Sequence, residues 1–274
     1  MQPFSQVYGH VPMRSVVQSD GMDDDLRRDL WNFTHMLYVR PELQRHGDFS
    51  RYLGIWIFTM KCDADHFPGD LMGEYLKKWI KGQEWYRVYD LLQELVDIED
   101  NSDSFNVMLD RNLAGYRLLE KRVVPISDEH ELDEIKAALA TPVDPVKQHL
   151  RQAIQHLSDR EEPDYPNSIK ESISATESFL ATITGKKKPL GEALKELKQM
   201  QKASGRFEHP ALLDGWSKMY GWSSDEHGIR HGGTEVPAEY ITQALARYVL
   251  ITCSAFINLL IAEQAAGHFP RPAT

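Results

Sequence analysis

The sequence has little cysteine and none of the common catalytic loops. Its 274 residues contain only Cys62 and Cys253, too few and too widely separated for a disulfide framework, which predicts a reducing compartment. No glycine-rich phosphate loop, nucleophile elbow or His-Glu-x-x-His pair occurs. This argues against a nucleoside triphosphatase, an α/β hydrolase and a zinc protease. We therefore expect a cytoplasmic protein that uses none of these three chemistries.

Positive charge is also scarce. The 31 lysines and arginines are outnumbered by 41 acidic residues, and the formal charge of −10 repels phosphate backbones, so any nucleic-acid binding needs a local basic surface. The first residues lack a basic segment followed by an apolar core, so no signal peptide is expected. The uncharged run from Tyr248 to Ala262 is short and carries polar side chains, which favours a buried helix over a membrane span.

Apolar residues recur at helical spacing along most of the chain, which predicts a mainly α fold. In the N-terminal half a small strand over Val11–Gln18 precedes a helix for which Ser19 and Asp20 are the expected caps. Further apolar-periodic segments, separated by proline, glycine or acidic breaks, cover Phe49–Met60, Asp70–Ile80, Glu84–Ile98 and Asp103–Leu113.

One stretch of this half predicts a β-hairpin. Tyr116–Leu119 and Val123–Ile126 flank Glu120-Lys121-Arg122, although the loop lacks the glycine typical of the tightest turns. A helix follows Ser127, with its apolar stripe at Leu132, Ile135, Ala138 and Leu139.

Two prolines in "ATPVDPVKQHL" predict a domain boundary that separates residues 1–141 from residues 142–274. The second domain reads as a helical bundle. Its expected helices are Val146–Leu157, Ser168–Thr184, Leu190–Gln201, Pro210–Tyr220 and Pro237–Ala265. In the second of these, Asn167 or Ser168 is the expected cap, and the inward stripe is Ile169, Ile173, Thr176 and Leu180.

The run "SSDEHGIRHGG" is the strongest candidate for chemistry. Arg230 and His231 supply a cation for phosphate oxygens and a group that moves protons, next to two glycines and ahead of the last helix. The same pair at a helix entrance also suits a structural ion pair with an acid across the bundle. The residues alone leave both interpretations open.

Longer runs resemble a known family. "DYPNSIKESISATESFLATITGKKKPLGEALKEL" and "HPALLDGWSKMYGWSSDEHGIRHGG", followed by a long helix, resemble the C-terminal HEPN domain of AbiJ-type abortive-infection proteins. "FSQVYGHVPMRSVVQSDGMDDDLRRDLWNF" is similar to an N-terminal domain of that group. The resemblance implies a sensing or regulatory domain over 1–141 and a four- or five-helix HEPN bundle over 142–274. It further implies a homodimer and, often, a metal-independent ribonuclease of phage defence or toxin–antitoxin systems.

The resemblance also assigns roles to individual residues. Arg230 matches the arginine of the HEPN motif and His231 its polar position, but no histidine follows until His268, so His231 or His227 has to move the proton. No metal or other cofactor is implied. RNA is the implied partner, together with an antitoxin or a phage-derived trigger. Residues expected to support the site are Asp225, Glu171 and Glu177, and those expected to hold phosphates are Lys170, Lys186, Lys187 and Lys188.

The departure from the motif leaves two functions open, a ribonuclease and a noncatalytic HEPN module that binds RNA, a nucleotide or a protein. Two other clusters have simpler explanations. "KCDADH" offers metal-ligand types but lacks a second pair at zinc spacing. The aromatic residues near Lys77, Lys78 and Lys81 suit a hydrophobic core better than a platform for single-stranded bases; they are Trp79, Trp85, Tyr86 and Tyr89.

Overall fold

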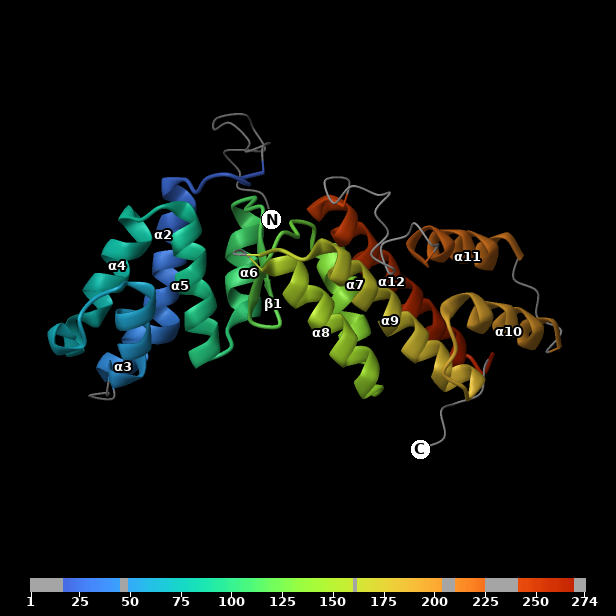
Figure 1. Cartoon of the computed structure of the whole chain (residues 1–274). Coiled ribbons are helices and arrows are strands. Elements are labelled where there is room, and N and C mark those ends of the chain that lie inside the picture. The colour runs from blue at the N-terminus through green and yellow to red at the C-terminus, as the bar shows by residue number, and fades with distance from the viewer. Residues whose placement is uncertain (1–16, 45–48, 160–161, 204–209, 225–240, 269–274) are drawn as a thin grey trace, which may run out of the picture. The chain divides into compact units, whose positions relative to one another are not determined.

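The computed structural model describes residues 17–44, 49–159, 162–203, 210–224 and 241–268 (Figure 1). These residues are mainly helical, as expected, with one small antiparallel hairpin. The chain divides into two compact units, Met1–Asp128 and Glu129–Thr274. Helix α7 (Glu129–Leu139), which precedes the proline-rich stretch, packs against α12 (Gln243–Ala265) inside the second unit.

The first unit is built from short helical segments around an aromatic core. Its α-helices are α2 (Asp24–Thr34), α3 (Arg40–Gln44), α4 (Met72–Gly82), α5 (Trp85–Ile98) and α6 (Ser102–Arg111). Between them lie the 3₁₀ segments η2 (Phe49–Tyr52), η4 (Ala64–His66) and η5 (Gly69–Leu71) and the π-helical segments η1 (His35–Val39) and η3 (Ile55–Thr59). The apolar-periodic segment expected over Phe49–Met60 is helical, as a 3₁₀ segment followed by a π-helical one.

The first helix starts later than the sequence suggested. Asp23 is its cap, because the Asp23 carboxylate accepts a hydrogen bond from the Leu26 N–H at 2.9 Å. A cap must immediately precede the first helical turn to reach these donors, so Ser19 and Asp20 are too far upstream. Most of the strand expected over Val11–Gln18 lies outside the described residues, and Gln18 forms an isolated bridge with Ala114.

The hairpin is confirmed. Strands β1 (Arg117–Leu119) and β2 (Arg122–Val124) pair antiparallel, with Leu119 opposite Arg122. Glu120 and Lys121 form the two-residue turn with φ values of 48° and 62°. Both fall in the left-handed region that the tightest hairpin turn requires, so two non-glycine residues adopt the conformation for which glycine was expected.

A buried arginine fixes the base of this hairpin. The Arg117 side chain is 2% exposed, and its guanidinium donates to the carbonyls of Ala114 (2.7 Å), Tyr116 (2.9 Å) and Ser127 (2.8 Å). It also pairs with the Asp110 carboxylate at 2.9 Å. Because a buried guanidinium needs partners for its donors, this network ties α6, β1 and the chain after β2 together.

The second unit consists of longer helices. Besides α7 and α12 it contains α8 (Asp144–Ser158), α9 (Tyr165–Thr184), α10 (Leu190–Ala203) and α11 (Pro210–Ser224). Helix α9 packs against α8, α10 and α12 and is the centre of the unit. Its expected inward stripe is confirmed, since Ile169, Ile173, Thr176 and Leu180 are all buried.

Helix α9, by contrast, begins earlier than expected. Asp164 is its cap, because the Asp164 carboxylate accepts a hydrogen bond from the Asn167 N–H at 3.0 Å. Asn167 and Ser168, the expected caps, lie inside the first turn. Burial acts to raise the pKa of Asp164, but hydrogen bonds from Asn167 and the nearby His156 hold that pKa below its ordinary value.

Candidate functional site

The central residues of the predicted site lie outside the described residues: Asp225, His227, Arg230 and His231. They fall between the end of α11 at Ser224 and the start of α12 at Gln243. The expected helix start at Pro237 also lies outside the described residues. As described, α12 is capped by the Thr242 hydroxyl, which accepts from the Leu245 N–H at 3.3 Å.

The supporting carboxylates lie on α9, and each has a partner. The Glu171 carboxylate lies 2.6 Å from Nδ1 of His149 on α8. Both side chains are partly buried, with 17% of Glu171 and 28% of His149 exposed. The Glu177 carboxylate accepts a hydrogen bond from the Leu190 N–H at 3.1 Å, at the start of α10. Glu177 thus accepts from one of the free N–H groups that a helix N-terminus offers to anions.

Three of the four expected phosphate-binding lysines lie in the loop after α9, whereas Lys170 lies near the start of that helix. Lys170 is exposed on α9, and Gly185 ends the helix with a φ of 72°, the left-handed conformation that terminates many helices. Lys186 and Lys187 follow and are exposed. The Lys188 ammonium pairs with Glu196 at 2.6 Å, so part of the positive charge of this loop is neutralised by α10.

His149 was not among the residues selected from the sequence, and the signal that could have found it is its spacing from His156 on α8. His149 and His156 are seven residues apart and so lie on one flank of α8; His149 contacts Glu171 on α9, and His156 lies near Asp164, the cap of α9. A histidine held through Nδ1 by a carboxylate is oriented as a proton-transfer group is in many active sites. The His149–Glu171 pair therefore suits proton chemistry, and His268 with Glu263 is a second described pair of the same kind.

A row of small polar residues lets the helices around α9 approach closely. Ser168, Ser172 and Thr176 are fully buried. The Ser168 hydroxyl donates to the Ala153 carbonyl of α8 at 2.9 Å, and the Ser172 hydroxyl donates to the Ser168 carbonyl at 2.8 Å. Since every hydroxyl in this row has an acceptor, the row is a packing surface between helices rather than an open pocket.

Helix α12 is the one helix of the described residues that is long and apolar enough to cross a membrane. Its inner face packs against α7, α8 and α9, and it contributes Val249, Cys253 and Ile257 to the core. A core helix passes the same test of length and composition, and the packing of this face agrees with the expected buried helix.

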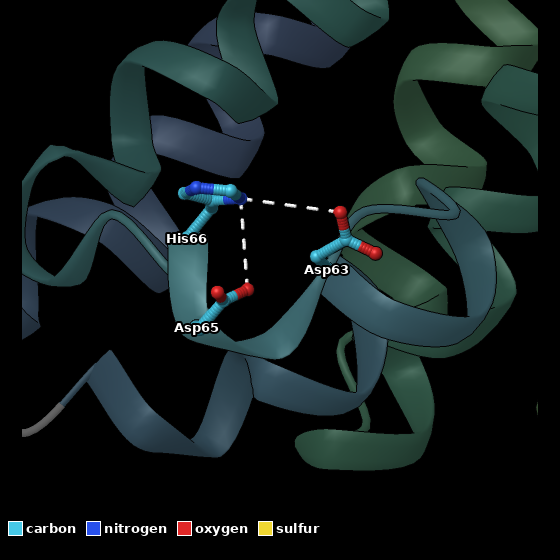
Figure 2. A group of neighbouring side chains, drawn as sticks. All are labelled: Asp63, Asp65 and His66. Carbon is cyan, nitrogen blue, oxygen red and sulfur yellow. Dashed lines mark ion pairs between the residues drawn. The ribbon is translucent and has the colours of Figure 1, made fainter.

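The cluster in "KCDADH" is a surface group. Figure 2 shows that Nδ1 of His66 faces two carboxylates, Asp65 at 3.6 Å and Asp63 at 4.0 Å. All three side chains are at least 75% exposed. Cys62 is not part of the group, because its thiol contacts the Met60 carbonyl. Three exposed ligands make a poor metal site, since structural zinc sites fix four ligands in a closed shell.

The expected role of the aromatic residues is confirmed for two of them. Tyr89 is fully buried and Trp79 is 9% exposed, so both belong to the core of the first unit. Trp85 is partly buried and stacks on Tyr116, with ring centroids 5.7 Å apart, while Tyr86 is exposed at the edge of this cluster.

Comparison with known proteins identifies the N-terminal half. A family model described as AbiJ N-terminal domain 4 matches residues 2–141, just over half of the chain. No curated protein and no solved structure matches significantly. The match stops at residue 141, so it does not bear on the HEPN resemblance of residues 142–274. The chain belongs to the AbiJ N-terminal domain 4 family and is an AbiJ-type protein.

Proposed function

We propose that this protein acts in prokaryotic abortive infection or toxin–antitoxin defence and that residues 142–274 form a HEPN endoribonuclease that needs no metal. The observation that carries the proposal is the AbiJ N-terminal domain over residues 2–141, because it indicates an abortive-infection protein. The helical second unit, with "DEHGIRHGG" between α11 and α12, supports the HEPN part. The protein would work in the cytoplasm and be controlled by an antitoxin or a phage-derived trigger.

The proposed reaction uses the ribose of the substrate as the nucleophile. His231 or His227 takes the proton from the 2′-hydroxyl, whose oxygen attacks the adjacent phosphorus. The bond from phosphorus to the 5′-oxygen breaks, and that oxygen receives a proton, which leaves a 2′,3′-cyclic phosphate and a 5′-hydroxyl. Arg230 stabilises the negative charge that develops on the phosphorus oxygens.

The other expected residues keep supporting roles in the proposal. Asp225 orients an imidazole, and Glu171 or Glu177 orients Arg230. Lys170 and the three lysines of the loop hold flanking phosphates, mainly through the exposed Lys186 and Lys187. Each of these two carboxylates also has a described partner, the His149 imidazole for Glu171 and the Leu190 N–H for Glu177.

A homodimer is part of the same proposal. The outer face of α12 carries Tyr248, Thr252, Ala255 and Leu259 at alternating spacings of four and three residues, without a charge. Tyr248 is 56% exposed and Leu259 is 36% exposed, and the Thr252 hydroxyl donates to the Tyr248 carbonyl at 2.7 Å. Two copies of this acidic chain repel each other where both surfaces are charged. An uncharged face avoids that repulsion and therefore suits contact with a second copy.

The decisive experiment measures cleavage and its end groups. Purified protein is incubated with total RNA in the presence of a chelator, and the fragments are tested for cyclic-phosphate ends. We expect such ends from the natural protein and none from Arg230→Ala. Arg111→Ala is the control, because Arg111 is exposed on α6 in the first unit and lies outside the proposed site.

The result also separates the two functions left open. Intact RNA with both the natural protein and Arg230→Ala contradicts a ribonuclease. If the natural protein then still shifts RNA in a binding assay and Arg230→Ala does not, residues 142–274 form a noncatalytic binding module.

A further inference from the structure

Helix α4 in the first unit carries three lysines that no carboxylate neutralises. Lys77, Lys78 and Lys81 are all exposed, and within the described residues none of them lies within ion-pair distance of an acid. The contacts of the first two are with aromatic rings, since the Lys77 ammonium lies 5.6 Å from the Trp31 ring centroid and that of Lys78 lies 5.4 Å from Tyr75. In a chain with a net charge of −10, this helix is a local basic surface.

Helix α2 packs beside α4 (Figure 1). The Arg27 guanidinium donates to the Ile80 carbonyl at 2.7 Å, near the end of α4 that carries Lys81. One turn further along α2, Trp31 lies under Lys77, and its ring centroid is 5.5 Å from that of His35. We call the five residues Arg27, Trp31, His35, Lys77 and Lys81 the α2–α4 strip.

The strip alternates cations with rings along one surface. Arg27, Trp31 and His35 follow each other at four-residue spacing and are only partly buried. Arg27 and Trp31 therefore lie one turn apart on one face of α2, and His35 follows at the start of η1. Lys77 and Lys81 have the same spacing on α4. On these two helices Asp25 and Asp29 pair with Arg28, at 2.7 Å and 3.5 Å. The remaining charged residues are four cations, Arg27, Lys77, Lys78 and Lys81, against two acids, Asp24 and Glu74.

We propose that the α2–α4 strip binds single-stranded nucleic acid. The lysines and Arg27 would contact successive phosphates, and the partly exposed rings of Trp31 and His35 would stack with bases. Proteins that bind single strands without reading sequence combine these two features, a basic groove along the backbone and rings that accept any base. An acidic peptide would satisfy the cations but would leave the rings unused, so a single strand fits the observed residues better.

This function is separate from the proposed cleavage, because it uses the first unit and needs no chemistry. The probe is therefore a fluorescein-labelled 12-mer of thymidylate, which lacks the 2′-hydroxyl that the cleavage reaction requires. Binding to the full-length protein is followed by fluorescence anisotropy at low salt and over a salt series. We expect Lys77→Glu/Lys81→Glu to weaken binding by roughly tenfold and to reduce the salt slope by about 0.7 for each lost phosphate contact.

The control makes the same change of charge elsewhere. Lys195→Glu/Lys218→Glu alters two exposed lysines on α10 and α11 and shifts the net charge equally. It should change the affinity by less than about threefold. Trp31→Leu, checked for an unchanged unfolding midpoint, should lower the affinity without altering the salt slope, because it removes stacking and no charge.

Three outcomes would overturn the inference: no binding of the 12-mer at low salt, equal losses in the two double variants, or equally strong competition by poly-glutamate. Cleavage of RNA bears on the other proposal alone. A protein that cleaves RNA and fails these binding tests has no functional strip, whereas one that passes them and leaves RNA intact has a strip without a ribonuclease.

Discussion

The two units reach a stable helical structure by different means. The first consists of short α-helices interrupted by 3₁₀ and π-helical segments, and buried aromatic residues such as Tyr38, Tyr52 and Tyr89 fill its core. The second consists of longer α-helices that meet along small side chains, such as Ser168, Ser172 and Ala175 on α9. Large aromatic side chains fill the core of the first unit. In the second unit small side chains let the helices pack closely, so little space is left between them.

The difference shows in the hydrogen bonds. Irregular segments leave backbone carbonyls without helical donors, and in the first unit side chains supply them. The Tyr52 hydroxyl donates to the Tyr38 carbonyl at 3.0 Å, the Tyr38 hydroxyl to the Glu99 carbonyl at 2.6 Å, and the Trp56 indole to the Asp63 carbonyl at 2.7 Å. In the second unit the buried hydroxyls of Ser172 and Ser254 bond within their own helices. Single polar side chains should therefore matter more in the first unit.

The largest effect should come from Arg117. Replacing it with methionine keeps much of the volume but leaves three carbonyls and the Asp110 carboxylate without their donor. We expect the free energy of unfolding of the first unit to fall by about 3 kcal/mol, measured by urea denaturation. Arg111→Ala, an exposed change on the same helix as Asp110, should cost less than about 0.5 kcal/mol. Equal losses in the two variants would contradict the structural role of the buried guanidinium.

The close packing of the second unit can be broken by adding volume. Ser172→Leu places a large side chain where α9 is fully buried, so we expect a loss of about 2 kcal/mol in the free energy of unfolding. Ser172→Ala removes only a hydroxyl that bonds within its own helix and should cost less than about 1 kcal/mol. A well-tolerated leucine would show that the helices do not meet closely at this position.

The helix caps allow a matched comparison between the units. Asp23 caps α2 in the first unit and Asp164 caps α9 in the second, each through a backbone N–H three residues later. Replacing either with alanine should cost about 1 kcal/mol at pH 7. Asp164 should also show a pH effect, because its pKa is lowered in the folded state. The stability it adds is present above its ordinary pKa of 3.8 and is lost as the pH falls through the lower folded value, which urea denaturation between pH 3 and pH 6 would detect.

The smallest effect should be a difference in alkaline sensitivity. Burial raises the pKa of the Cys253 thiol from 9.0 to about 12 and that of the Tyr38 hydroxyl from 10.0 to about 12. A raised folded pKa means that the stability from each group is complete below its unfolded pKa and is lost as the pH rises toward the folded value. The second unit should therefore begin to weaken near pH 9 and the first near pH 10. Up to pH 9.5 we expect either unit to lose less than about 1 kcal/mol of its free energy of unfolding.

Variants of the two cysteines test this assignment. Cys253→Ala should flatten the alkaline decline of the second unit, whereas Cys62→Ala, at a partly exposed thiol in the first unit, should leave it unchanged. A decline that persists in Cys253→Ala would place its origin in another group. A thiol reagent at neutral pH should label Cys62 in the folded protein much faster than Cys253, because the latter is fully buried.

Several elements could be predicted from the sequence because their signals are local. The spacing of Leu132 and Ile135 predicted α7, the stripe from Ile169 to Leu180 predicted the buried face of α9, and two runs of β-branched and apolar residues predicted the hairpin. The caps were placed wrongly, at Ser19 or Asp20 for α2 and at Asn167 or Ser168 for α9. Several polar residues lie near the start of each helix, and only the geometry of the first turn selects one of them.

The candidate site was only partly accessible to the same reasoning. Lysines and acids on α9 and its loop could be selected by type, but the partners they choose depend on which helix lies opposite. Glu171 meets His149, which lies 22 residues earlier on α8, and Glu177 meets the backbone of Leu190. Similarly, Trp31 and Lys77 are far apart in the sequence and combine into one surface only because α2 packs beside α4.

The sequence by itself determined the helical class, the apolar face of most helices, the hairpin and the membership of an abortive-infection family, because each is encoded in local periodicity or in a continuous run of residues. The tertiary structure alone decided the π-helical segments of the first unit, the burial of Arg117 and the pairing of His149 with Glu171. These features arise when distant segments compete for the same space and the same hydrogen-bond partners, and that competition has no signal within a single segment.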